Sequence, residues 1–233
     1  MEKQEIITAI VLAAGRGTRM ESNVQKQYMM LAGRPLIYYA LAAFEKSPVN
    51  QIILVTGPGE EAFCKTEIVD EFGFSKVTAI VPGGKERYHS VYEGLKRAAG
   101  SDYVLIHDGA RPCVTETIIR AAIDGARESG ACVIGMPVKD TIKISDDAGF
   151  AESTPDRSRL WTIQTPQAFS YPLVKAAYDR LFENEENQRG ITDDAMVVET
   201  MTTQKVRLVH GSYKNMKVTT PEDMAVAEVF LDL

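Results

Sequence analysis

The chain has 233 residues, 45% of them hydrophobic and 25% charged, and this balance predicts a globular domain rather than a disordered segment. No apolar run approaches the roughly 20 residues of a membrane helix, and the acidic N-terminus is unlike a secretory signal. The formal net charge of −6 argues against DNA or RNA as a partner. The three cysteines lack a C-x-x-C pair, which indicates neither a disulfide framework nor a zinc site. We expect a cytoplasmic protein that binds neither nucleic acid nor membrane.

Apolar runs of strand length alternate with segments of helical period along most of the chain. The runs cover residues 6–12, 51–56, 76–81, 102–107, 131–138 and 205–209. The helical segments cover residues 35–44, 60–71, 86–99 and 115–129. Several runs are almost continuously apolar, which is typical of strands covered on both faces. The pattern predicts an α/β fold with a doubly wound, mostly parallel, twisted sheet and helices on both of its faces.

The segment 139–161 departs from this alternation. It reads as a short strand, a turn at 146–149 and a returning strand, with too little apolar surface for a core of its own. We expect one domain over 1–233 from which this segment protrudes as a β-arm that packs on a second copy of the chain in a homodimer. A hairpin folded back on its own domain remains the alternative.

The stretch 10–20, "IVLAAGRGTRM", places a glycine turn directly after the first strand. It is not the dinucleotide fingerprint, because Met20 stands where the third glycine belongs and the strand 51–56 ends in Thr56 rather than in an acidic residue. Small residues allow backbone N–H groups to approach a phosphate, with Arg16 or Arg19 as charged donors. A tight turn with solvated arginines is the alternative.

Further polar clusters follow other predicted strands. Residues 82–91, "PGGKERYHSV", lie between a strand and a helix, but Glu86 after Gly84-Lys85 excludes a P-loop. Asp108 follows a buried apolar strand, and a carboxylate in that position suits a magnesium ligand, although Asp-Gly is also an ordinary turn. Thr219 or Thr220 with Pro221 predicts that a helix begins just after Lys217. Together the clusters supply the charged side chains of Arg19, Lys26, Asp108, Arg111 and Lys217. They favour phosphate chemistry by positioning and electrostatics, with Mg²⁺ bridging the oxyanions.

Eight motifs in order carry a family resemblance. They are "LAAGRGTRM", "KQY", "PGGKERYHSVYEGL", "HDGARP", "PVKDTIK", "LWTIQTPQAF", "TDDAMVVE" and "NMKVTTPEDMAVAE". From about residue 8 to the C-terminus, the chain resembles the 2-C-methyl-D-erythritol 4-phosphate cytidylyltransferase family. The resemblance implies a Rossmann-like nucleotidyltransferase fold and a homodimer joined by the arm. It also implies transfer of CMP from CTP to 2-C-methyl-D-erythritol 4-phosphate, with release of pyrophosphate, in the non-mevalonate isoprenoid pathway. Gln25 stands where the family usually has proline.

The resemblance also implies roles for individual residues. Arg19 and Lys26 are expected to stabilise charge on the triphosphate, and Asp108 is expected to bind Mg²⁺. The expected nucleotide-binding residues are Ala13, Ala14, Gly15, Gly17, Gly83, Gly84, Arg87 and Ser90. The expected site for the sugar-alcohol phosphate contains Arg111, Thr141, Arg157, Thr165, Thr192 and Lys217, with Arg157 and Lys217 counted among the catalytic residues. Thr141 and Arg157 lie on the predicted arm and would serve the neighbouring subunit.

Two other functions remain open at this point. Ribitol 5-phosphate cytidylyltransferases share the glycine turn, the "GG…R…S" loop and the late "KVTT", but Ala110 and Leu160-Trp161 lean away from that branch. A non-catalytic nucleotide-binding protein could keep the fold without the chemistry. The joint presence of Arg19, Lys26, Asp108 and Lys217 argues against the second alternative.

Overall fold

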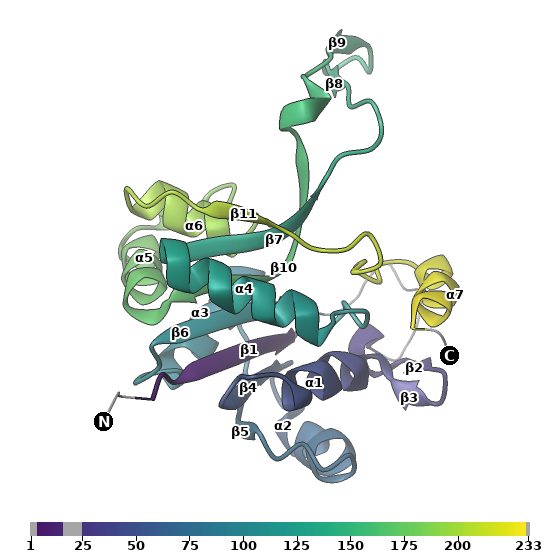
Figure 1. The fold of residues 1–233 in the computed structure, drawn as a ribbon, viewed down its shortest axis with the longest axis vertical. Helices are drawn as coiled ribbons and strands as arrows, with labels where there is room; N and C mark the ends of the chain where they lie inside the picture. Colours follow the sequence, from purple (N-terminus) through teal and green to yellow (C-terminus); the bar gives the residue numbers. More distant parts are fainter. Residues whose placement is uncertain (1–3, 16–24, 232–233) are drawn as a thin grey trace.

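The computed structural model describes residues 4–15 and 25–231 and contains a seven-stranded sheet with the strand order β11-β7-β10-β6-β1-β4-β5 (Figure 1). All neighbouring strands pair in parallel except β10, which is antiparallel to both β6 and β7. The strands are β1 Ile7–Ala13, β4 Gln51–Thr56, β5 Val77–Pro82, β6 Tyr103–Asp108, β7 Ala131–Pro137, β10 Trp161–Ser170 and β11 Arg207–His210. The predicted α/β fold with a mostly parallel sheet is confirmed.

Helices cover both faces of the sheet. One core contains apolar side chains of α1 and α4 against Ala9 and Val11 of β1, and a second core contains side chains of α3, α5 and α6 against Ile10. Consecutive residues of β1 therefore face opposite cores, which explains why its sequence is continuously apolar. The helices are α1 Leu36–Lys46, α2 Glu61–Phe63, α3 Arg87–Arg97, α4 Glu116–Ser129, α5 Tyr171–Glu183, α6 Asp194–Met201 and α7 Pro221–Phe230.

Most predicted elements lie within a few residues of the observed ones. The helix predicted over 60–71 is α2 followed by a π-helix, Cys64–Asp70. The polar stretch 183–188 contains the 3₁₀ helix Glu185–Gln188. The helix start at Pro221 is confirmed, with a capping box between Thr220 and Asp223.

Strand β10 is the strand of the seven-stranded sheet that the sequence pattern did not predict, and helices α5 and α6 are not among the predicted helical segments either. Its antiparallel direction brings its N-terminal half to the sheet edge at which the parallel strands end. The register with β7 shifts between Ile163 and Gln167, and within this irregular stretch the Thr165 hydroxyl accepts a hydrogen bond of 3.1 Å from the backbone N–H of Asp108. This inserted strand therefore adds side chains to the carboxyl edge of the sheet.

The segment 139–161 extends away from the sheet (Figure 1). Its strands β8 Ile144–Ser145 and β9 Ala151–Ser153 form a separate two-stranded sheet, and the 3₁₀ helix Arg157–Arg159 precedes β10. Residues 139–159 are exposed except for Pro155, and the side chain of Phe150 is 73% exposed. A smaller hairpin, β2 Met30–Leu31 with β3 Arg34–Pro35, lies before α1. None of the helices within 4–15 and 25–231 is both long and apolar enough to cross a membrane.

Candidate active site

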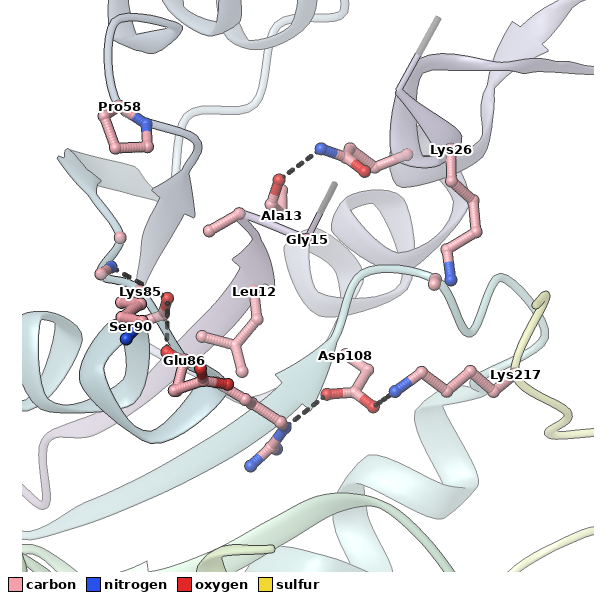
Figure 2. Close-up of a pocket in the computed structure, with 16 residues that line it drawn as sticks. Leu12, Ala13, Gly15, Lys26, Pro58, Lys85, Glu86, Ser90, Asp108 and Lys217 are labelled. Carbon is pink, nitrogen blue, oxygen red and sulfur yellow. Dashed lines mark hydrogen bonds and ion pairs between the residues drawn. The ribbon is translucent and has the colours of Figure 1, made fainter. Parts of the chain in front are cut away.

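A cavity of about 960 Å³ opens at the carboxyl edge of the sheet, where β1, β5 and β6 end (Figure 2). In doubly wound sheets this edge is where ligands bind. The lining residues are Leu12, Ala13, Ala14, Gly15, Lys26, Gln27, Pro58, Gly83, Gly84, Lys85, Glu86, Arg87, Ser90, Asp108, Ala110 and Lys217. All the described residues expected to bind the nucleotide line this cavity, together with Lys26, Asp108 and Lys217. Gly17 and Arg19 lie outside the described residues.

The loop after β5 packs closely against the end of β1. The Gly83 N–H donates to the carbonyl oxygen of Thr56 at 2.7 Å, and the Gly84 N–H donates to the Ser90 hydroxyl at 3.1 Å. A Cβ atom at position 83 would lie 2.5 Å from the Ala14 Cβ and 2.6 Å from the Ser90 Oγ. Glycine is therefore required at Gly83 for the two loops to approach each other.

The eleven-residue helix α3 begins at this cavity with Arg87. A capping box at Glu86 and His89 fixes its first turn, and the partial positive charge of a helix N-terminus favours anions nearby. The loop after β5 and the start of α3 thus present backbone donors and a positive end to the same space. This arrangement suits a phosphorylated or polar ligand.

Asp108 is the last residue of β6, and its carboxylate lies between two cations (Figure 2). Its Oδ1 accepts from the Arg87 Nε at 3.1 Å and its Oδ2 from the Lys217 Nζ at 2.7 Å. Burial alone would raise the pKa of Asp108, but Arg87 and Lys217 together hold that pKa well below its ordinary value. The carboxylate is therefore ionised at neutral pH.

Arg87 also contacts a second carboxylate. Its Nη1 and Nη2 donate to the two oxygens of Asp194, the first residue of α6, at 2.9 and 2.8 Å. Burial lowers the pKa of Arg87, but the carboxylates of Asp194 and Asp108 outweigh burial and raise it well above the ordinary value. With all three side-chain nitrogens bonded to carboxylates, Arg87 lines the cavity as part of a buried ion network. Sequence reasoning did not single out Asp194, although the motif "TDDAMVVE" contains it.

Lys26 begins the 3₁₀ helix Lys26–Tyr28, and its side chain reaches the cavity (Figure 2). The buried side chain of Gln27 donates to the carbonyl oxygen of Ala13 at 2.5 Å, and the Tyr28 hydroxyl donates to Glu60 Oε2 at 2.8 Å. Gln27 was not predicted as a site residue, although it belongs to the quoted "KQY" motif. These contacts fix the segment that carries Lys26 against the end of β1.

His107 connects Asp108 with residues expected to bind the acceptor. Its Nε2 lies 3.3 Å from the carbonyl oxygen of Arg111, which can only accept, so Nε2 carries the proton and Nδ1 accepts from the Thr165 hydroxyl at 3.0 Å. Burial lowers the pKa of His107 to about 3, so the ring is neutral and supplies no charge. His107 therefore has a structural role, fixing Thr165 and the backbone of Arg111 beside Asp108.

The remaining residues expected at the acceptor site do not line the cavity. The Arg111 Nη1 donates to the carbonyl oxygen of Asn215 at 2.9 Å, and its Nε is buried with no hydrogen-bond partner among the described residues. The Thr192 hydroxyl is exposed and lies 3.6 Å from the Met196 Sδ. Thr141 and Arg157 lie on the arm, where the Arg157 Nη1 donates to the carbonyl oxygen of Lys139 at 2.8 Å. The cavity of one chain therefore contains Lys217 but neither arm residue of the expected acceptor set.

Among the described residues, two carboxylates line the cavity, and because the Glu86 side chain caps α3, Asp108 is the one suited to a magnesium ion. Within 4–15 and 25–231 no group of three or more His, Cys, Asp or Glu side chains could hold a metal ion. Mg²⁺ bound to a nucleotide needs only one or two carboxylates, because phosphate oxygens and waters fill its other positions. The ionised Asp108 at the end of a rigid strand fits that requirement.

Comparison with known proteins agrees with this geometry. The model of the family 2-C-methyl-D-erythritol 4-phosphate cytidylyltransferase matches residues 7–233. The chain belongs to this family. The enzyme of that name from Lachnoclostridium phytofermentans is 51% identical over 227 residues, which is 97% of each chain. The crystal structure of 4-diphosphocytidyl-2C-methyl-D-erythritol synthase from Anaerococcus prevotii covers 98% of this chain and 97% of its own, with a TM-score of 0.85 and 34% identity.

Another solved relative from this family is more distant in sequence. The 2-C-methyl-D-erythritol 4-phosphate cytidylyltransferase of Thermus thermophilus has a TM-score of 0.77 and 28% identity, and the match covers 96% of this chain and 98% of that chain. The Rossmann-like nucleotidyltransferase fold implied by the sequence motifs is confirmed. Family membership makes the protein a CTP-dependent cytidylyltransferase of isoprenoid biosynthesis.

Proposed function

We propose that the cavity at the sheet edge binds CTP and transfers CMP to 2-C-methyl-D-erythritol 4-phosphate, with release of pyrophosphate. The observation that carries this proposal is the ionised Asp108 between Arg87 and Lys217, beneath two loops of small residues at the carboxyl ends of β1 and β5. Membership of the family identifies the acceptor and the nucleotide of the reaction. The lining of the cavity supports the assignment of the groups that would act on them.

The chemistry needs charge neutralisation rather than a strong base. An oxygen of the acceptor's phosphate attacks the α-phosphorus of CTP, the new P–O bond forms, and the bond to the β-phosphate oxygen breaks to release pyrophosphate. The attacking oxygen is already ionised at neutral pH, so the barrier comes largely from bringing two polyanions together. Lys26 and Lys217 reach the cavity from two different segments (Figure 2) and reduce that repulsion.

In this proposal the two loops hold the nucleotide. The segment Ala13–Gly15 offers small residues beside the phosphates, and Gly83, Gly84 and Ser90 form the wall next to the base and ribose. The close contact between Gly83 and Ala14 supports this assignment, because it joins both loops into one surface. Backbone donors and acceptors in that wall can favour cytosine over uracil by hydrogen bonding.

We propose Asp108 as the protein ligand of Mg²⁺. The bound ion would screen the phosphate oxygens and orient the triphosphate. Both Asp108 oxygens are in ion pairs, at 3.1 Å to Arg87 and 2.7 Å to Lys217. Lys217 has a flexible stem and a 37% exposed side chain, so its ammonium can turn from Asp108 to a phosphate group when the substrates bind.

The acceptor site is proposed to form between two copies of the chain. Arg111, Thr165, Thr192 and Lys217 would come from one copy, and Thr141 and Arg157 from the arm of the other. The exposed apolar side chains Ile142, Ile144 and Phe150 on this arm support the proposal, because a second copy would cover them.

The three described cysteines are free and buried, which agrees with a cytoplasmic protein.

The direct test is pyrophosphate release with Mg·CTP, measured with 2-C-methyl-D-erythritol 4-phosphate and ribitol 5-phosphate in parallel and with ATP, GTP and UTP as nucleotide controls. The proposal predicts release only with CTP and the methylerythritol phosphate. Equal or faster release with ribitol 5-phosphate would overturn the acceptor, and no release with any pair would overturn the enzymatic role.

A further inference from the structure

Asp194 joins three helices to the end of β6 although it does not line the cavity. Its side chain is fully buried and accepts two hydrogen bonds from Arg87, at 2.9 and 2.8 Å. The Tyr178 hydroxyl of α5 donates to Asp194 Oδ1 at 2.6 Å. Because Arg87 Nε contacts Asp108 at 3.1 Å, a continuous chain of polar contacts runs from Tyr178 through Asp194 and Arg87 to Asp108.

Arg87 donates hydrogen bonds to both Asp194 and Asp108, and this division limits how strongly it binds Asp108. The two Nη groups face Asp194, so only Nε reaches Asp108. A guanidinium bound to a carboxylate through two parallel hydrogen bonds holds it more strongly than through one. Without the negative charge of Asp194, the donors of Arg87 would be available to Asp108 for such a pair, and that pair would compete with any cation for the carboxylate.

Hydrogen bonds to neighbouring residues also fix the start of α6, which carries Asp194. Asp193 caps α6 by accepting from the Met196 N–H at 2.9 Å and also accepts from the Gln167 side chain of β10 at 2.9 Å. The oxygen of the Gln167 amide in turn accepts from the Ala195 N–H at 2.9 Å. The start of α6 is thus held against the sheet, and Asp194 provides a rigid partner for Arg87.

We propose that Asp194 and Tyr178 are positioning residues for cytidylyl transfer: they hold Arg87 so that it orients Asp108 by one hydrogen bond and leaves the carboxylate accessible to the magnesium ion of Mg·CTP. This inference rests on the proposed function, in which Asp108 is the metal ligand. Arg87 is then a permanent support of Asp108, whereas Lys217 is the cation that Asp108 exchanges on substrate binding.

The test compares two tyrosine–aspartate pairs that connect with α5. Asp194→Asn removes the charge at nearly constant volume, and Tyr178→Phe removes only the hydroxyl. Asp179→Asn and Tyr92→Phe are the matched controls, because the Tyr92 hydroxyl of α3 donates to Asp179 of α5 at 2.7 Å in a pair that does not include Arg87. Each protein is assayed for kcat, for the KM of CTP and for the Mg²⁺ concentration that gives half-maximal turnover. Binding of Mn²⁺ to the protein with CTP and no acceptor, followed by water-proton relaxation, gives a readout independent of activity.

Asp194→Asn is expected to raise the Mg²⁺ midpoint and weaken Mn²⁺ binding by about 10–100-fold, the usual effect of losing a group that orients a metal ligand. Tyr178→Phe is expected to shift both in the same direction by roughly 2–10-fold, because one hydrogen bond to a retained carboxylate is lost. The controls are expected to keep the wild-type metal dependence, whatever their melting temperature.

Wild-type metal dependence in a folded Asp194→Asn variant would overturn the inference. If that variant does not fold, Tyr178→Phe decides in the same way, and equal behaviour of Tyr178→Phe and Tyr92→Phe would overturn it. These results are distinguishable from failure of the proposed function, in which the wild-type protein itself would release no pyrophosphate from CTP.

Discussion

The cavity and the arm hold the side chains proposed to act in the reaction in different ways. Around the cavity, hydrogen bonds through Arg87 and Asp194 connect Asp108 with helices α3, α6 and α5. The close contact at Gly83 fixes the loop after β5 against the loop after β1. On the arm, Thr141 and Arg157 are exposed, and the local sheet consists of strands of two and three residues. In the proposed function, this difference separates the two halves of the reaction. The half of the site proposed for the nucleotide is preorganised in one chain, whereas the half proposed for the acceptor would need surface from a second copy.

The largest expected effect is the loss of Lys26. We expect Lys26→Ala to lower turnover by about 10²–10³-fold, because it removes a positive charge that lines the cavity and that we propose stabilises the triphosphate. The melting temperature should change little, since the segment remains held by Gln27 and Tyr28. Steady-state kinetics and a thermal melt check both, with the exposed Lys46→Ala as the control. Near-normal turnover of Lys26→Ala would show that Lys26 does not have its proposed role in the reaction.

Gly83→Ala tests the preorganised half by overpacking it. The new Cβ would lie 2.5 Å from the Ala14 Cβ, so the two loops must separate. Such strain costs about 1–3 kcal/mol. Because we propose that CTP binds across both loops at their native spacing, restoring that spacing on binding should raise the KM of CTP by roughly 5–150-fold. The double variant Gly83→Ala/Ala14→Gly removes the nearest contact and should recover part of the loss. A normal KM of CTP in the single variant would show that the contact between the loops is unimportant.

Arg157→Ala tests the arm. We expect the KM of the acceptor to rise about tenfold or more and that of CTP to remain within roughly threefold, because in the proposed site the lost charge would pair with the acceptor's phosphate. Arg159→Ala, in the same exposed 3₁₀ helix, is the matched control. Equal changes in the two KM values, or an effect of the same size from Arg159→Ala, would contradict the assignment.

The smallest expected effect concerns the helix that follows Lys217. Asp223 accepts hydrogen bonds from the N–H groups of Thr219 and Thr220 at 2.7 and 2.9 Å. Burial raises the pKa of Asp223, but these bonds outweigh it and lower the pKa below the ordinary 3.8. The stabilisation is therefore fully present above pH 4 and is lost as the pH falls through the folded-state value.

Asp223→Ala should accordingly lower the free energy of unfolding by about 0.5–2 kcal/mol at pH 7. The difference from wild type should shrink as the pH falls below about 4, which urea unfolding at several pH values can measure. A difference that is constant with pH would mean that the charge of Asp223 does not contribute.

The sequence predicted the parallel strands and the clusters at their ends because these depend on local pattern. Strand β10 escaped because "WTIQTPQAFS" contains glutamines and a proline rather than an apolar run. The buried amides of Gln164 and Gln167 bond to Ser212 and Asp193, so distant segments satisfy them and the sequence of the strand alone does not reveal its burial.

In the candidate site, too, local sequence does not reveal contacts between distant segments. Motif resemblance indicated Lys26, Asp108 and Lys217, but the partner of Arg87 lies 107 positions away at Asp194. An aspartate at the start of a helix ordinarily predicts a cap, and its burial against an arginine depends on how α3 and α6 pack. Local sequence therefore identifies the groups that face the cavity better than it identifies the groups that hold them.

The most direct test of two complementary halves is to mix two impaired variants and assay them at an acceptor concentration below the wild-type KM, where each variant alone is slow. Lys26→Ala loses the nucleotide half of its own site, and Arg157→Ala loses the arm contribution to its neighbour's site. If each site joins one chain's cavity to the other's arm, co-expressed subunits should recover about a quarter of wild-type turnover, because half the dimers are mixed and each has one intact site. A mixture no more active than the average of the two variants would contradict a shared site.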